Sequence, residues 1–465
     1  MSDSTPGRRS ASRPNVAFDA TTVLALLVPV LTVVALLLVK PDQPEAVRRD
    51  PTRTALTSAS IVCPSALPGA PAAYLTTAEA RARGTVRLTT GSGTAEERLS
   101  SGTVTQLDRG VGPLIVTGED ELAPGLVGAR FGSRRLAAVA CPAPSPDQWF
   151  TGVGAGSRRN SVVELVNPDA GPAVADVAVY GRSGPADVPR LRGVAVPGRS
   201  SVRLDLGSVV PQRGDLALHV VTQRGRLATS VVTTNDDLAG PPSTEWLAAQ
   251  ARPVTHNVLM GLPPGSGTRT LVVANEGDDE VRATVRFISA ESVFAPRGVD
   301  EVRVPPGGVQ RVEITTALED ALRRGAVGVD LTSSGPVAAS LLSFADDDLS
   351  YAVSGAAITT DATVLVPEGR KQLVLGGVDG VGAVTVVSRT ADGEVLDRSR
   401  AALRPGRGAA VKVPDDAVLV SVLPERTSVT GSVLVSGNGA AVVPLRPQVR
   451  SGLVPDVRPG LPSAD

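Results

Sequence analysis

One uninterrupted apolar segment stands out near the start of the chain. Residues 20–39 are uncharged and mostly Leu, Val and Ala, whereas the flanking segments 1–19 and 40–58 are polar. Twenty helical residues span about 30 Å, the thickness of a bilayer core. No small-residue cleavage site follows, so the pattern predicts an uncleaved transmembrane helix, with a cleavable signal as the alternative.

Charge does not fix the orientation of this helix. Three arginines precede the apolar segment and four basic residues follow it between positions 40 and 53, so the positive-inside comparison is nearly balanced. Long domains translocate largely regardless of charge. The cysteine pattern and the fold class both favour a cytoplasmic segment 1–19, a linker over 40–58 and an extracytoplasmic remainder.

Beyond residue 58 the pattern changes to short Val, Leu and Ala alternations broken by Gly, Pro, Asn and Asp. Alternation with a period of two predicts half-buried strands. The pattern itself repeats: Asn167 and Asn275 each follow an apolar strand, and Pro197-Gly198 and Pro306-Gly307 each follow a later one. These landmarks shift by about 108 to 110 residues, and a shorter third copy follows, which predicts duplicated β domains.

A repeat of about 100 residues with around seven short strands has the size of an immunoglobulin-like β-sandwich. We therefore expect an all-β protein of tandem immunoglobulin-like β-sandwich domains over 147–245, 246–360 and 361–443, behind the single N-terminal transmembrane helix. Segment 59–146 is expected to be a fourth β module, whose completeness the pattern leaves open. Residues 444–465, with five prolines, are expected to be an extended or disordered tail.

Two local signals refine the second repeat. The pair Ser334-Gly335 predicts a turn between strands at 327–331 and 337–343. Thr316 followed by Glu319 has the spacing of a capping box and predicts a short helix over 317–323. Little other helix is expected between residues 155 and 440.

The only two cysteines are Cys63 and Cys141, which bracket the first β module. An even, sparse cysteine count behind a membrane-targeting segment is typical of an oxidising compartment. Each cysteine precedes a proline, which biases it toward extended backbone. We therefore predict a Cys63–Cys141 disulfide, with two buried free thiols as the alternative.

Recognisable catalytic chemistry is scarce. The only histidines are His219, in a predicted strand, and His256, between predicted domains, and no nucleophile-elbow, phosphate-loop or zinc motif occurs. Two carboxylates suffice for a glycosidase, but 47 acidic residues single out no pair. The net charge of −1 gives no reason to expect nucleic acid. We predict a protein that is not an enzyme and needs no cofactor.

Two acidic clusters occupy matching places in the repeat, Asn235-Asp236-Asp237 and Asp346-Asp347-Asp348. Calcium prefers six to eight oxygen ligands, but neither cluster has the spaced acidic pattern of a dedicated calcium loop. We expect solvated turns, with calcium as the alternative.

Aromatic residues make up 2% of the chain, and the two tryptophans fall at predicted domain boundaries. Trp149 and its neighbour Phe150 begin the first repeat, and Trp246 begins the second. We expect Trp149, Phe150 and Trp246 to pack one domain against the next, with an exposed ligand platform as the alternative.

Several stretches together resemble a known family. They are the apolar segment, the Cys63–Cys141 module, Cys141-Pro142-Ala143-Pro144 leading to Trp149-Phe150-Thr151-Gly152, and the strand Leu165-Val166-Asn167-Pro168. They look like an actinobacterial family of membrane-anchored secreted proteins of unknown function. The resemblance implies a cell-envelope location and transfers no catalytic residue. Richness in Ala, Val, Gly, Pro and Arg is likewise typical of GC-rich bacteria.

These observations lead to one expected function and two alternatives. We expect a non-enzymatic, single-pass membrane protein whose extracytoplasmic domains act as a scaffold or interaction surface in a bacterial envelope. The alternatives are a module that binds envelope glycan or peptidoglycan and a carboxylate-based hydrolase. The expected partners are the membrane and an envelope protein or glycan, not nucleic acid.

Overall fold

The computed structural model describes residues 20–38, 52–132, 134–210, 213–236, 240–250 and 252–454. The chain divides into two compact units, one of Met1–Thr52 with Leu453–Asp465 and one of Arg53–Gly452. The predicted cytoplasmic segment 1–19 and most of the predicted linker and tail lie outside the described residues.

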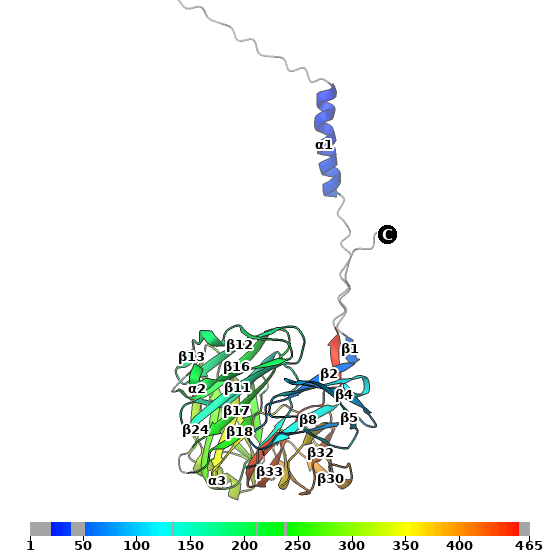
Figure 1. The fold of residues 1–465 in the computed structure, drawn as a ribbon. Helices are drawn as coiled ribbons and strands as arrows, with labels where there is room; N and C mark the ends of the chain where they lie inside the picture. Colours follow the sequence, from blue (N-terminus) through cyan, green and yellow to red (C-terminus); the bar gives the residue numbers. More distant parts are fainter. Residues whose placement is uncertain are drawn as a thin grey trace, which may run out of the picture. The chain divides into compact units, whose positions relative to one another are not determined.

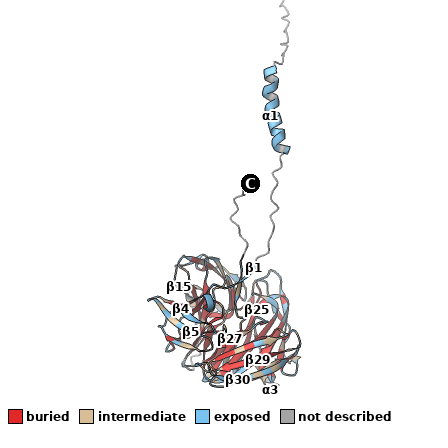
Figure 2. Ribbon diagram, turned by 90° about the vertical axis from the view of Figure 1, so that its right-hand side faces the viewer, coloured by how far each residue is buried: buried red, intermediate tan, exposed pale blue. Residues whose placement is uncertain are grey.

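The first unit contains the helix α1, Ala20–Leu38, with Pro29 inside it. The prediction of a helix over this segment is confirmed, apart from Val39, which lies outside the described residues. Its large apolar side chains are exposed where they are described, for example Leu24 at 66% and Leu36 at 71% (Figure 2). Among the described residues, no helix combines the length and the apolar character needed to cross a membrane.

The second unit is built almost entirely of small antiparallel sheets (Figure 1). Its first module has two four-stranded sheets, in the orders β2-β7-β4-β5 and β6-β3-β8-β9. The side chains between these sheets form one apolar core that includes Leu75, Val86 and Leu114. The elements are β2 Ser58–Cys63, β3 Ala72–Thr77, β4 Arg83–Thr90, β5 Gly93–Ser100, β6 Thr105–Asp108, β7 Leu114–Glu119, η1 Asp120–Leu122, β8 Leu126–Phe131 and β9 Ala138–Ala140.

The second module follows the same plan within one nine-stranded sheet that folds over at the β10–β11 hairpin. Its core includes Phe150, Leu165 and Leu218. The elements are β10 Asp147–Ala155, β11 Arg159–Asn167, β12 Ala173–Gly181, β13 Gly184–Ala186, η2 Pro189–Leu191, β14 Val194–Val196, β15 Ser200–Asp205, α2 Leu206–Val209, β16 Arg213–Arg224, β17 Ala228–Asn235 and β18 Ser243–Leu247.

The third and fourth modules complete the series. The third comprises β19 Val254–Met260, β20 Gly267–Ala274, β21 Val281–Ser289, β22 Val293–Phe294, β23 Val302–Val304, β24 Val309–Glu313, α3 Thr315–Arg323, β25 Ala326–Ala345 and β26 Asp348–Val353. The fourth has sheets β27-β32-β29-β30 and β31-β28-β33-β34. Its strands are β27 Ala362–Leu365, β28 Arg370–Gly376, β29 Gly382–Arg389, β30 Val395–Leu403, β31 Ala409–Val413, β32 Leu419–Glu425, β33 Thr430–Gly437 and β34 Gly439–Pro444.

All four modules share one strand connectivity. The first and third strands of a module pair with the same late strand, in the sets β2-β7-β4, β10-β16-β12, β19-β25-β21 and β27-β32-β29. The second strand pairs with the following late strand, which then pairs with the final one, in the sets β3-β8-β9, β11-β17-β18 and β28-β33-β34. In the third module the long strand β25 takes the place of both late strands, so the second set is β20-β25-β26. The module before residue 147 is therefore a full copy of the repeat, although its sequence landmarks are weak.

The side chains of Asn167 and Asn275 make equivalent hydrogen bonds in their modules. Asn167 donates to the carbonyls of Gly171 and Val196 and accepts from the amide of Asp169. Asn275 repeats this arrangement with Asp279, Pro305 and Gly277. Both side chains are buried, so each ties the turn after its strand to a second turn and leaves little of its hydrogen-bonding capacity unused.

The predicted turn at Ser334-Gly335 is wrong. Strand β25 runs without a break from Ala326 to Ala345, pairing with β19 and β21 in its first half and with β20 and β26 in its second. A Cβ on Gly335 would lie 2.9 Å from Val281, so the glycine serves close approach of a neighbouring strand rather than chain reversal.

The predicted short helix exists, but its predicted cap does not. Helix α3 begins at Thr315, and its N-cap residue Ile314 makes no side-chain capping bond. The hydroxyl of Thr315 instead accepts from the amide of Arg269. Helix α2, in the equivalent place of the second module, was not predicted and is capped by Asp205.

The predicted linker and tail each contain a strand. In the described parts of these segments, β1 (Thr52–Ala55) and β35 (Ser451–Val454) form a two-stranded sheet. The amide of Leu56 also donates to the carbonyl of Arg450. The start and the end of the second unit are therefore neighbours.

The four modules close into a ring. Apolar contacts join the first module to the second through Val62 and Val166, and the third to the fourth through Met260 and Val374. Trp149 joins the second to the third. The ring closes because Ala129 of the first module packs on Leu365 and Leu419 of the fourth.

Hydrogen bonds link the final strands of the modules around the centre of this ring. The amide of Ala138, in β9, donates to Glu245 of β18. The hydroxyl of Ser243 (β18) donates to Asp348 (β26), whose other oxygen accepts from the amide of Ala440 (β34). The amide of Leu136, just before β9, donates to the carbonyl of Asn438, just before β34.

The predicted Cys63–Cys141 disulfide is confirmed. Cys63 ends β2 in one sheet of the first module, and the amide of Cys141 donates to Gly128 in β8 of the other sheet. The Cα atoms are 4.2 Å apart, slightly below the usual lower bound of about 4.4 Å. The bond therefore joins the two sheets across the core of the module.

Replacing both cysteines by alanine should lower the free energy of unfolding of the first module. A disulfide that closes a loop of 78 residues restricts the unfolded chain and contributes roughly 4 kcal/mol in the chain-entropy account, less any strain. Urea unfolding of the oxidised protein and of the Cys63→Ala/Cys141→Ala variant measures the loss. Reductant should destabilise the wild type and leave the variant unchanged; equal stability of the oxidised wild type and the variant would contradict the assigned role.

Candidate functional site

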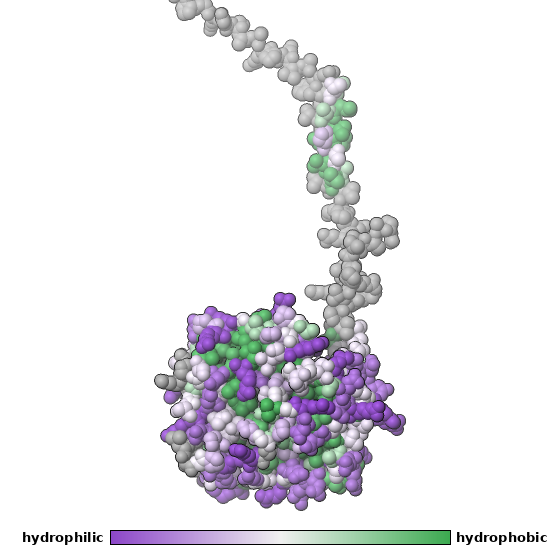
Figure 3. Space-filling view, viewed as in Figure 1, coloured by the Kyte–Doolittle hydropathy of each residue, from purple (hydrophilic) through white to green (hydrophobic). Residues whose placement is uncertain are grey.

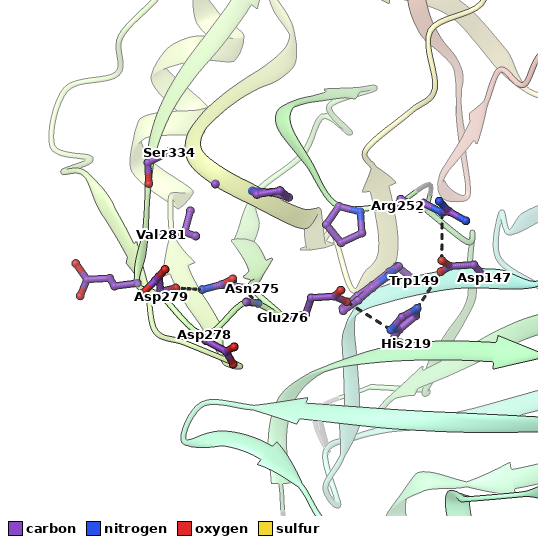
Figure 4. Close-up of a pocket in the computed structure, with 15 residues that line it drawn as sticks. Asp147, Trp149, His219, Arg252, Asn275, Glu276, Asp278, Asp279, Val281 and Ser334 are labelled. Atoms are coloured by element: carbon purple, nitrogen blue, oxygen red, sulfur yellow. Dashed lines mark hydrogen bonds and ion pairs between the residues drawn. The ribbon is translucent and has the colours of Figure 1, made fainter.

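A cavity of about 640 Å³ lies at the junction of the second and third modules (Figure 4). One wall carries Asp147 and Trp149 from β10 and His219 from β16. Arg252, from the connection between β18 and β19, belongs to the same wall. The other wall is the acidic turn 275–280 that follows β20 in the third module. The site is thus assembled from segments that are more than a hundred residues apart.

His219 is held between two carboxylates. Its Nε2 lies 2.9 Å from Asp147 Oδ1, and its Nδ1 lies 3.5 Å from Glu276 Oε2. The second oxygen of Asp147 lies 3.2 Å from Nε of Arg252. Asp147 therefore contacts both the imidazole of His219 and the guanidinium of Arg252, and the histidine bridges the two modules.

Trp149 forms the floor beside this histidine. The two side chains are cross-strand neighbours, and their rings stack with centroids 4.4 Å apart. Tyr180 lies against the same indole with centroids 5.4 Å apart. Trp149 is only 1% exposed and also packs on Val272 and Val309 of the third module, so it fills the junction and offers no open face for a ligand ring.

Phe150 and Trp246 are buried away from this cavity. Phe150 follows Trp149 in a strand, so it points to the opposite face, and it is fully buried in the core of the second module. Trp246 is 3% exposed and packs on Leu67 and Val139 of the first module. The sequence placed Trp246 between the second and third modules, whereas the structure places it between the first and second.

The geometry around His219 does not match a Ser-His-Asp arrangement. A general base needs one ring nitrogen free to face a nucleophile, but Asp147 and Glu276 face both nitrogens. Ser334, which also lines the cavity, lies on the far side of Glu276 (Figure 4). The arrangement instead suits recognition, because the acidic turn offers carboxylate acceptors to hydroxyl or ammonium groups of a ligand.

The other histidine belongs to a surface ion cluster. His256 Nε2 lies 3.0 Å from Asp330, which also lies 3.1 Å from Arg286. The hydrogen bond to Asp330 raises the pKa of His256 above its ordinary value. Its side chain is 53% exposed, and this cluster stabilises the pairing of β19, β21 and β25.

The acidic clusters have structural roles where they are described. Asp346 and Asp347 have positive φ and form the tight turn between β25 and β26, and Asp346 accepts from the amide of Ser266. Asp237 lies outside the described residues. Within the described ranges, no group of three or more His, Cys, Asp or Glu side chains is placed to hold a metal ion.

The centre of the ring contains two buried acids, Glu245 and Asp348. Sequence reasoning did not single out Glu245, and its expectation of a solvated turn is wrong for Asp348, which is 3% exposed. Burial raises the pKa of Glu245 well above its ordinary value, and the nearby Asp348 adds to this shift. Burial likewise raises the pKa of Asp348. Glu245 accepts from the amides of Trp246 and Ala138. A proton on Glu245 therefore avoids an uncompensated charge where three modules meet.

Comparison with known protein families matches residues 102–414 to a family of unknown function (DUF5719). The match covers more than half of the 465 residues. The chain belongs to this family. No curated protein matches the chain. The family match begins within the first module and ends within the fourth, and it includes the cavity at the second junction, whereas Cys63 lies outside the matched range.

Substituting Glu245 by glutamine should flatten the pH dependence of stability. The pKa of an unfolded glutamate is about 4.3. Because the pKa of Glu245 is raised in the folded state, the folded protein holds the proton more tightly than the unfolded chain. The carboxyl then contributes its full stability below the unfolded pKa, and this contribution is lost as the pH rises through the raised folded pKa. Wild type should therefore lose free energy of unfolding as the pH rises from the unfolded pKa through the raised folded pKa, and Glu245→Gln should lose less.

Urea titrations at a series of pH values measure this slope. Glu394→Gln is the matched control, because Glu394 is exposed on a turn of the fourth module. The control should follow the wild-type curve. A Glu245→Gln variant that is equally pH-dependent, or that is much less stable than wild type at pH 8, would show that the carboxyl is charged in the folded protein.

Proposed function

We propose that this protein is a membrane-anchored, extracytoplasmic interaction protein of a bacterial cell envelope. Its four modules act as immunoglobulin-like β-sandwiches that together form one platform. The observation that carries the proposal is the closure of the ring: buried contacts join the first module to the fourth through Ala129, Leu365 and Leu419. Tandem domains that served only as a spacer would have no need of such contacts between the two ends.

Three features support the proposed location. Residues 20–39 form an uncharged apolar segment, and the described Leu and Val side chains of α1 are exposed. The Cys63–Cys141 disulfide suits an oxidising compartment. The resemblance of the Cys-Pro and Trp-Phe-Thr-Gly stretches to actinobacterial secreted proteins is consistent with both.

A non-catalytic role agrees with the chemistry of the described residues. Both nitrogens of His219 face carboxylates, and the disulfide uses both cysteines. The face of the second unit seen in Figure 3 is mostly polar, with apolar residues showing in its middle.

A glycan-binding role is the second candidate, and the cavity beside His219 favours it. Its acidic turn, which includes Glu276, Asp278 and Asp279, presents carboxylate oxygens to a space of about 640 Å³. Carboxylates accept hydrogen bonds from sugar hydroxyls and attract the ammonium groups of amino sugars. A hydrolase acting through two of these carboxylates would use the same cavity.

The proposed extracytoplasmic location of the modules predicts that protease added to spheroplasts removes a tag fused after Asp465. The reason is that the long C-terminal part follows the apolar segment across the membrane. Immunoblotting of the tag, with a cytoplasmic protein as the control for intact cells, measures the outcome. A tag that resists protease until the cells are lysed would place the ring on the cytoplasmic side.

Purified envelope glycan distinguishes the two candidate functions. If the cavity binds glycan, Asp278→Asn should reduce co-sedimentation of the full chain by about tenfold, because a hydrogen bond to a charged group is lost. Asp300→Asn, at an exposed residue outside the cavity, is the control. Equal sedimentation of both variants would reject the glycan site, and release of soluble sugars would indicate a hydrolase.

A further inference from the structure

Two further cavities lie where the four connections that follow the final strands come together. The smaller, of about 330 Å³, is lined by the connections after β9, β18, β26 and β34. The larger, of about 410 Å³, adds apolar side chains of the first module, including Ile61 and Leu126. The two cavities share Arg446, and their volumes are within the roughly 300–1,000 Å³ typical of small-ligand pockets.

Arg446 is a cation without an anionic partner. One of its terminal nitrogens donates to the carbonyl of Ala249 at 2.9 Å, and no carboxylate of the described residues pairs with it. Desolvation lowers the pKa of Arg446, with no neighbouring acid to oppose the shift. A guanidinium has five N–H donors arranged in a planar fork, so most of its capacity for a carboxylate is unused here.

Gln250 provides a second, independent polar group whose hydrogen-bonding capacity is not satisfied. Its side chain lines the smaller cavity and is 4% exposed. Its Nε2 donates to the hydroxyl of Thr151 at 2.6 Å, but its Oε1 has no hydrogen-bond partner in the described structure. Whichever way the amide is turned, one polar atom stays unpaired, and a buried unpaired polar atom is costly.

The neighbouring charges narrow the class of ligand. Arg226, at the larger cavity, already forms a two-point ion pair with Asp169, so Arg446 is the free cation among the described lining residues. Asp147 lines the smaller cavity and disfavours an anion with two charges, such as phosphate. The apolar lining beside Arg446 includes small side chains, notably Ala143, Pro447 and Val449, and the larger residues Ile61 and Leu126 line the larger cavity only.

We propose that these joined cavities bind the end of a short peptide that has a free terminal carboxylate and small apolar side chains. The carboxylate pairs with the Arg446 guanidinium, and a peptide N–H donates to the amide of Gln250. A peptide is favoured over a fatty acid because it carries an N–H donor near its carboxylate. This site lies beside the acidic cavity at His219, with which it shares Asp147 as a lining residue, and it does not depend on the membrane topology.

The test uses the full chain in detergent and the probe Nα-acetyl-Ala-Val-Ala, compared with the same tripeptide amidated at its C-terminus. Isothermal titration should detect binding of the acid, with the amide weaker by about tenfold or more, because a charge-assisted pair is lost. Arg446→Gln should weaken binding of the acid to the level of the amide. Arg303→Gln, at an exposed residue of β23, is the control and should bind like wild type.

Other outcomes would overturn the proposal. Equal affinity for acid and amide, or no binding of either at millimolar concentration, would show that Arg446 does not capture a peptide carboxylate. Octanoate or inorganic phosphate that binds more tightly than the peptide would assign the cavities to another anion. If Arg446→Gln fails to fold, the comparison of acid with amide on wild type still decides. Gln250→Leu should weaken binding of the acid and leave the acid-to-amide ratio unchanged, because it removes the acceptor of a peptide N–H that both probes carry.

Discussion

The architecture depends on hydrogen bonds between final strands that belong to different modules. Asp348 joins β26 to β18 through Ser243 and to β34 through the amide of Ala440. Asp348 is buried in the assembled ring, so both of its oxygens depend on donors from neighbouring modules. Removing one donor while the site stays closed would leave a buried acceptor unpaired, which is costly. This explains why residues 53–452 form one compact unit.

Sequence reasoning found what repeats and local chemistry encode. The period of two, the asparagine landmarks and the paired cysteines led to β modules, their approximate spacing and the disulfide. Two errors came from treating short motifs as sufficient. Ser334-Gly335 lies within a continuous strand, and Thr316 lies inside a helix that starts at Thr315 without a side-chain cap. In both places tertiary pairing outweighed the local signal.

The candidate sites were largely invisible in the sequence. Trp149 and His219 were noticed separately, but nothing in their spacing showed that they face each other across β10 and β16. Asp147 had a weak signal, because residues two apart in a strand share a face. Arg446 and Gln250 meet only because the ring brings distant connections together, and no period or motif reports such closure.

Closure of the ring also has a consequence for the order of folding. The first module needs the fourth as its partner, and the residues of the fourth that contact Ala129, namely Leu365 and Leu419, follow it by more than 200 residues in the sequence. Until the fourth module is made, the apolar surface around Tyr74 and Phe131 has nothing to cover it. During synthesis from the N-terminus this apolar surface stays exposed until the fourth module has folded, and exposed apolar surface is prone to aggregation. The disulfide lies within the first module and can form before the fourth module is made, so it stabilises the first module during that interval.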